Sequence, residues 1–430
     1  MPPMLIERAR IVDPSRGLDA VGSVIIENGV IRAAGPEVLN QGHPEAAEIV
    51  DGTGLVCIPG LVDGRVFVGE PGAEHRETLA TASAAAAAGG VTTMVTMPNT
   101  DPVIDDPALV DFLRRRASAT SRVKVAPMAA LTRGAEGKEM TEIGLLSEAG
   151  AVAFTDGKAA IANAALMRRA LIYARDFEAL IVNHVEEPTL ASGVMNAGER
   201  ASRLGLTGVP REAETIMLDR DLRLVAATKG RYHAAQISCA DAVEAMRGAR
   251  ERGLDVSCGV SIAHLTLNEI DIGTYRSFLK MSPPLRSEED RVAMVQALAD
   301  GLIDWVVSSH DPQDSEMKRH PFAEAADGAV GLETLLPAAL RLVHGGEVGL
   351  SALIRALSTA PARRLGLNAG TLSAGASADL VLLDIDEPWV LDRAKLASRS
   401  KNTPFEDARF TGRVLRTLVA GRTVYRYGRG

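Results

Sequence analysis

The feature that most constrains the fold is a regular alternation of short apolar stretches with longer helix-favouring segments in the middle of the chain. The pattern occupies roughly 300 of the 430 residues. Parallel strands need long crossover connections, usually helices, so this alternation predicts a parallel sheet, and its length suits an eight-stranded (β/α)8 barrel. The expected strands and helices are residues 60–68, 76–88, 91–97, 107–119, 123–129, 139–149, 152–155, 163–175, 179–184, 212–228, 231–238, 240–252, 255–260, 288–300 and 304–310. In such barrels the active site lies at the carboxyl ends of the strands.

Both ends of the chain have a different pattern, made of short strand-like pieces without intervening helices. These pieces are residues 4–12, 23–27, 30–34 and 48–56 at the start, and 379–384, 413–420 and 422–426 at the end. Asn28-Gly29 between two apolar runs is a strong signal for a β-hairpin. We therefore predict a small β-sandwich built from both termini, residues 1–56 and 367–430, around a barrel of residues 57–366.

Composition narrows the class of protein. The net charge is −8 and no long run of like charges occurs, which disfavours a nucleic-acid or anionic-membrane surface. No segment approaches the roughly 18 uninterrupted apolar residues of a membrane span. The three cysteines, Cys57, Cys239 and Cys258, are far apart and form no disulfide-like pattern. We expect a cytoplasmic protein.

The segment that begins the predicted barrel carries a specific resemblance. It reads Pro59-Gly60-Leu61-Val62-Asp63 and continues with residues 64–72, GRVFVGEPG. This is similar to the first barrel strand of the dihydroorotases, cyclic amidohydrolases whose pattern runs P-G-x-x-D-x-H-x-H-x-R-E-P-G. Further similar segments, in the family's order, are residues 97–100, 154–157, 183–186, 220–221, 280–286, 301–312, 321–322, 331–334 and 401–405. The resemblance implies an amidohydrolase-type barrel with a pair of metal ions that activate a hydroxide in its mouth.

Most positions of the family's metal ligands hold other residues here. The two histidines of the first strand are replaced by Arg65 and Phe67. A guanidinium has no acceptor and a phenyl ring has no donor atom, so neither binds a divalent cation. The ligand histidine of a later strand is Gln236, and the aspartate that also shuttles a proton is Ser309. Serine is a poor general base without an activating partner.

Two family positions that can ligate a metal are retained, His184 and Asp156. They are vestigial candidates, and a hydrogen-bonded core histidine is the alternative interpretation of His184. Asp311 lies two positions beyond Ser309, where it could compensate for the lost aspartate. We also hypothesise that Asp156 forms a salt bridge with Arg65, because an unpaired carboxylate in the barrel mouth would be costly.

The family's substrate-binding positions have also changed. Asn99 remains, but the arginine that grips the substrate carboxylate is Gly69, an asparagine is Ser282, and a late histidine is Gln313. The sequence therefore predicts a degenerate site without catalytic residues.

Three interpretations of function follow from the resemblance. The leading one is a non-catalytic dihydroorotase homologue, without cofactor, that serves as a scaffold for aspartate carbamoyltransferase in pyrimidine synthesis. The second is an active dihydroorotase, or a related cyclic amidohydrolase, with a reduced zinc site. The third is a non-enzymatic oligomeric binding protein. In each case we expect a homo- or hetero-oligomer.

Overall fold

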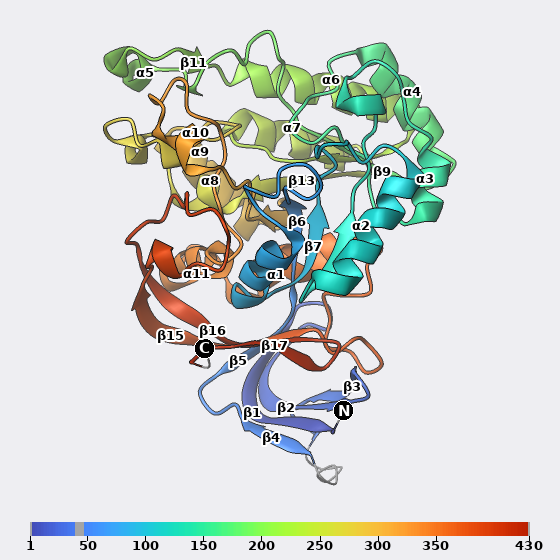
Figure 1. Cartoon of the computed structure of the whole chain (residues 1–430), viewed down its shortest axis with the longest axis vertical. Coiled ribbons are helices and arrows are strands. Elements are labelled where there is room, and N and C mark those ends of the chain that lie inside the picture. Colours follow the sequence, from blue (N-terminus) through green and yellow to red (C-terminus); the bar gives the residue numbers. More distant parts are fainter. Residues whose placement is uncertain (1, 39–46, 429–430) are drawn as a thin grey trace.

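The structure is a computed structural model that describes residues 2–38 and 47–428 (Figure 1). The parts of the predicted β domain at residues 1, 39–46 and 429–430 lie outside the described residues. In Figure 1 a helix-rich upper body rests on a curved β layer that contains both ends of the chain. The predicted fold class is confirmed.

The upper body is a closed barrel of parallel strands. Its strands are β6 (Leu61–Val66), β7 (Val91–Thr96), β8 (Lys124–Pro127), β9 (Leu180–Asn183), β12 (Arg231–Ala234), β13 (Val256–Ser261) and β14 (Trp305–Val307). The fourth strand position is a single bridging residue, Phe154, which pairs in parallel with Ala129 and Ile181. A parallel bridge between Val66 and His310 closes the ring. The predicted strand at residues 152–155 is thus reduced to its central residue.

Helices follow the strands and cover the outside of the barrel. They are α1 (Leu79–Ala88), α2 (Pro107–Thr120), α3 (Ile143–Ala149), α4 (Ala164–Arg175), α6 (Glu212–Thr228), α7 (Ala240–Glu251), α9 (Glu288–Ala299) and α11 (Leu335–His344). Short elements fill the connections: α5 (Glu199–Leu204), α8 (Ile262–Thr266), α10 (Ser315–Arg319), α12 (Leu350–Ile354), α13 (Ala360–Arg364), β10 (Met195–Asn196) and β11 (Gly208–Val209). None of the helices in residues 2–38 and 47–428 combines the length and the apolar composition that a membrane span requires.

Local sequence explains where several helices begin. The Asn163 side chain accepts the N–H groups of Ala165 and Leu166 and starts α4. Asp106 caps α2, whose first residue is Pro107, a position where proline costs no hydrogen bond. The alanine-rich α1 begins at a capping box on Thr78 and ends at Gly89, as the sequence indicates.

The lower layer is one eight-stranded sheet from both chain ends. Its strands are β1 (Met4–Asp13), β2 (Leu18–Glu27), β3 (Val30–Gly35), β4 (Glu48–Asp51), β5 (Val56–Pro59), β15 (Leu380–Val390), β16 (Arg409–Val419) and β17 (Arg422–Arg426). The order is β17-β16-β15-β5-β1-β2-β3, with β4 beside β1. The β2–β3 hairpin turns at Asn28 and Gly29, both with positive φ, as predicted. Strand β5 crosses the predicted boundary between residues 56 and 57.

Large buried side chains occupy the inside of the barrel. Trp305 is 1% exposed and stacks on His233, with ring centroids 3.6 Å apart. Gly64 makes this packing possible, because a Cβ there would lie 2.6 Å from the Trp305 ring. The three cysteines are free and buried.

Candidate functional site

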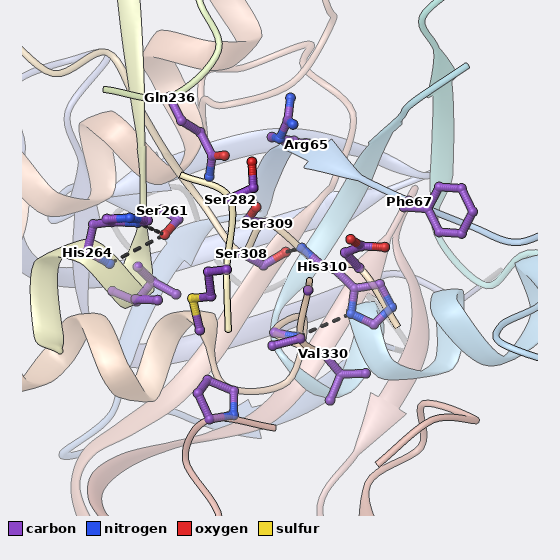
Figure 2. A pocket seen from close by; sticks show the side chains of 18 of the residues that line it. Arg65, Phe67, Gln236, Ser261, His264, Ser282, Ser308, Ser309, His310 and Val330 are labelled. Atoms are coloured by element: carbon purple, nitrogen blue, oxygen red, sulfur yellow. Dashed lines mark hydrogen bonds between the residues drawn. The ribbon is translucent and has the colours of Figure 1, made fainter. Parts of the chain in front are cut away.

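The candidate site is a cavity of about 40 Å³ at the carboxyl ends of β6, β12 and β14 (Figure 2). We call it the mouth pocket. It is lined by Arg65, Phe67, Met97, Lys158, Gln236, residues 261–264, Met281, Ser282, residues 308–311, residues 328–331, Pro404 and Phe405. Of the predicted site residues, Arg65, Phe67, Gln236, Ser309 and Asp311 are brought together here. Asn99, Asp156 and His184 are not among the lining residues.

Arg65 brings a buried positive charge into the mouth pocket. Its position is fixed through Asp63, which accepts the backbone N–H groups of Arg65 at 3.3 Å and of Ser308 at 3.2 Å and so ties β6 to β14. The guanidinium is held by Gly157 O, 3.4 Å from both Nη1 and Nη2. Burial lowers the pKa of Arg65 to about 10, although Asp311 and Glu186 favour its charge. Arg65 is still a cation at neutral pH.

Phe67 contributes an apolar ring that lies apart from the polar groups in Figure 2. The Arg76 guanidinium lies over this ring, 4.4 Å from its centroid. Phe67 therefore shapes one wall of the pocket and offers no ligand atom.

Gln236 and Ser309 supply uncharged polar groups. Gln236 is 1% exposed, and neither its amide nitrogen nor its amide oxygen has a hydrogen-bond partner among the described residues. Ser309 has a φ of 51°, in the left-handed region that serine seldom adopts. Backbone strain of this kind concentrates at functional sites.

Asp311 is engaged by two cations. Its Oδ1 atom lies 2.8 Å from Arg76 Nη2, and its Oδ2 atom forms an ion pair with Lys158. The carboxylate is thus committed to charge pairs that hold the pocket wall, which argues against compensation for the lost aspartate.

His184 belongs to a hydrogen-bonded cluster beside the pocket. Its Nε2 atom lies 3.0 Å from Glu186 Oε2 and 3.2 Å from Ser282 Oγ, and Ser282 donates to Glu186 at 3.1 Å. Its Nδ1 atom is buried without a partner among the described residues. Burial alone would raise the pKa of Glu186, but the hydrogen bonds from His184 and Ser282 outweigh it and lower the pKa. Glu186 is therefore ionised at neutral pH.

The hypothesised salt bridge between Asp156 and Arg65 is wrong. Asp156 accepts the backbone N–H of Thr132 at 2.9 Å and its hydroxyl, and among the described residues it forms no ion pair within 4.0 Å. The turn of residues 155–157 presents the Gly157 carbonyl to Arg65 instead of the carboxylate. A carboxylate that receives backbone and hydroxyl donors is already compensated, so it needs no guanidinium.

The loop after β6 excludes the family's carboxylate-gripping arginine. A Cβ at Gly69 would lie 2.1 Å from the backbone oxygen of Ala73, because the loop closes tightly on itself. Gln313 is also occupied, since its Nε2 donates to Asp311 at 3.1 Å and to the Asp327 carbonyl at 2.8 Å. Asn99 packs against Gly157, and its Oδ1 atom is buried without a partner among the described residues.

Sequence reasoning missed a serine–histidine pair in the pocket wall. Ser261 Oγ lies 2.7 Å from His264 Nδ1, and His264 Nε2 lies 3.2 Å from the Pro284 carbonyl. Burial lowers the pKa of His264 to about 4, so the ring is neutral at pH 7. The available signal was the Ser-x-x-His spacing, in which Ser261 caps α8. Lys158, paired with Asp311, was also missed, and no local pattern marks it.

The described residues do not fit the metal centre that the resemblance implies. They contain no group of three or more histidine, cysteine, aspartate or glutamate side chains placed to hold an ion. The first-strand positions hold Arg65 and Phe67, and Asp156 is turned toward Thr132. An adjacent guanidinium would also repel a divalent cation.

Comparison with known proteins shows what this chain is similar to. A family described as "Dihydro-orotase-like" matches residues 54–242. A dihydroorotase of Pelobacter propionicus is 42% identical over 98% of this chain and 99% of its own length. One of Anaeromyxobacter dehalogenans is 43% identical over 98% of both. Among solved structures, an L-hydantoinase of Arthrobacter aurescens is 26% identical, with a TM-score of 0.90 over 100% of this chain and 97% of its own.

These relatives overturn the leading functional interpretation. The predictions of a non-catalytic scaffold and of a protein that is not an enzyme are wrong, because near-full-length relatives carry the names of hydrolytic enzymes. The prediction that no cofactor is needed is also wrong, because it rested on the interpretation that these relatives contradict. The physical reason is that the loss of metal ligands does not remove the other polar groups of the barrel mouth. Arg65 and Gln236 still line the pocket, and the hydrogen-bonded His184 cluster lies beside it.

Proposed function

Because the chain belongs to the dihydroorotase family, we propose that it interconverts dihydroorotate and N-carbamoyl-aspartate by opening and closing a cyclic amide. The observation that carries the proposal is the 42–43% identity to dihydroorotases over 98% of the chain. The position of the mouth pocket supports the proposal, because the pocket lies at the carboxyl ends of the barrel strands, where the active sites of such barrels lie.

Ring opening adds water across an amide C–N bond, so it needs a group that takes a proton from water and one that protonates the ring nitrogen. Glu186 is ionised and can accept a proton. Its hydrogen bonds from His184 and Ser282 hold the carboxylate in one orientation at the edge of the pocket. We assign both proton transfers to Glu186: its carboxylate takes a proton from the attacking water and then gives it to the ring nitrogen as the C–N bond breaks. His184 has a positioning role, because it holds the Glu186 carboxylate.

The test is turnover of dihydroorotate and of N-carbamoyl-aspartate by the purified chain, with the variants Glu186→Gln and Glu187→Gln. Glu187 is the matched control, because its carboxylate accepts from Thr189 and not from His184. We expect Glu186→Gln to lower kcat about 100-fold or more and Glu187→Gln to leave it nearly unchanged. A wild-type chain without turnover would refute the proposed activity. Equal effects of the two variants would refute the role of Glu186.

The expected partner, aspartate carbamoyltransferase, stays a separate proposal that rests on the resemblance alone. Its test is gel filtration of the purified chain with and without that enzyme. A shared elution position would support it, and two independent peaks would refute it.

A further inference from the structure

The mouth pocket contains polar groups whose binding capacity the protein does not use. The Gln236 amide is 1% exposed and unpartnered on both its atoms among the described residues. Arg65 is 5% exposed, and its hydrogen bonds to Gly157 O are long, at 3.4 Å. A buried polar group without a partner costs on the order of 1–3 kcal/mol, so such groups in a cavity indicate a ligand that completes them.

The charge of Arg65 is also uncompensated. Among the described residues, no carboxylate lies within 4.0 Å of its guanidinium. The two acidic groups that influence it have other partners: Asp311 pairs with Arg76 and Lys158, and Glu186 with His184. A buried guanidinium strongly favours a planar anion that accepts two parallel N–H bonds.

The positions with which the family binds the substrate carboxylate are closed or already occupied in the part of the chain that the structure describes. The family's arginine position is Gly69, where a Cβ would lie 2.1 Å from Ala73 O, so no side chain fits. Ser282 is bonded to Glu186, and Gln313 to Asp311 and Asp327. Of the two lysine and arginine side chains that line the mouth pocket, Lys158 is paired with Asp311, whereas Arg65 has no carboxylate partner within 4.0 Å among the described residues.

The size of the cavity points the same way. The cavity of about 40 Å³ exceeds the roughly 10–15 Å³ that one water needs, so it has room for a small polar group. A carboxylate is a group of this kind. In Figure 2 Arg65 and Gln236 lie at the same end of the pocket, near Ser282.

We propose that Arg65 and Gln236 form a carboxylate-binding subsite that selects the anionic ring dihydroorotate over the neutral ring dihydrouracil. The guanidinium donates two parallel N–H bonds to the two carboxylate oxygens, and the Gln236 amide nitrogen donates to one of these oxygens. The choice of probe rests on the proposed function, but the subsite is a binding property that is measured without turnover.

The experiment is isothermal titration of the purified chain with dihydroorotate and with dihydrouracil, which differ by the carboxylate. We expect wild type to bind dihydroorotate at least tenfold more tightly. Arg65→Gln should raise the Kd for dihydroorotate by about ten- to a hundredfold, the loss of one charge-assisted contact, and leave dihydrouracil unaffected. Arg122→Gln, at an exposed cation outside the mouth pocket, is the matched control and should leave both constants unchanged.

Two further variants keep the proposal testable if Arg65→Gln does not fold. Arg65→Lys keeps the positive charge but loses the planar guanidinium, so we expect it to bind dihydroorotate more weakly than wild type and more tightly than Arg65→Gln. Gln236→Leu should weaken dihydroorotate binding several-fold. Equal affinity of wild type for the two rings would overturn the proposal, as would unchanged dihydroorotate affinity in folded Arg65 and Gln236 variants. Selective binding without turnover would refute the proposed function and leave this subsite standing.

Discussion

The buried charge of Arg65 gives a prediction about stability whose size follows from the structure. Burial lowers the pKa of Arg65 to about 10, well below its ordinary value, and at about 1.4 kcal/mol per pH unit this corresponds to a destabilisation of about 3 kcal/mol. The sign follows from linkage. The pKa in the folded state lies below that in the unfolded state, so the destabilisation is fully present below pH 10 and disappears as the pH rises from the folded pKa to the ordinary arginine value.

Arg65→Met should therefore stabilise the ligand-free protein at pH 7. Methionine is apolar, unbranched and of similar length, so it fills the same space without a buried charge. The variant loses the two long hydrogen bonds to Gly157 O, and we estimate that their loss lowers the free energy of unfolding by about 1 kcal/mol. The expected net gain is about 1–2 kcal/mol.

The assay is urea unfolding at one protein concentration. The midpoints are compared with a common m-value, the slope of the unfolding free energy against urea concentration. Arg422→Met, at an exposed arginine of β17, is the control and should stay within about 0.5 kcal/mol of wild type. A loss of about 2 kcal/mol or more in Arg65→Met would refute the reasoning. It would mean that the guanidinium holds the barrel mouth together and is not an unsatisfied charge.

Three further predictions concern other sites. Gly69→Ala should lower the unfolding free energy by about 1–3 kcal/mol, because its Cβ would lie 2.1 Å from Ala73 O; unchanged melting would show that the loop yields easily. Tyr232→Phe should cost about 1–2 kcal/mol in urea unfolding, because the buried hydroxyl donates to Asp221 at 2.7 Å; a neutral result would argue against that bond. Burial raises the pKa of Glu333 to about 7, above its ordinary value of 4.5. The free energy of unfolding should therefore decrease as the pH rises from 4.5 to 7, because Glu333 is harder to ionise in the folded protein than in the unfolded one. Glu333→Gln should flatten that part of the stability profile, and an unchanged slope would contradict the assignment.

The barrel and the terminal sheet were predictable because both depend on local patterns. Apolar strands alternating with capped helices specify parallel strands with crossovers, and Asn28-Gly29 specifies a tight hairpin. The pattern was less informative where strands carry polar residues. Strand β15 continues to Val390 through Asp386 and Glu387, and its pairing with β16 shifts register in that stretch. The prediction therefore ended the strand at residue 384, where the apolar pattern stops.

The site could be predicted as a set of positions but not as a set of contacts. The family pattern identified Arg65, Gln236 and Ser309, which line one cavity. It could not show that Asp156 turns to Thr132, because that depends on a loop from a different part of the chain. The sequence also could not show that the Gln236 amide has no hydrogen-bond partner among the described residues, because this depends on which groups surround it in the folded pocket.

The most direct test of the central claim is the time course of dihydroorotate opening by the purified wild-type chain, with products separated and quantified. We expect turnover that Glu186→Gln lowers about 100-fold or more and that Arg65→Gln weakens through a raised KM. Consumption of dihydroorotate no faster than in a heat-denatured sample would contradict it.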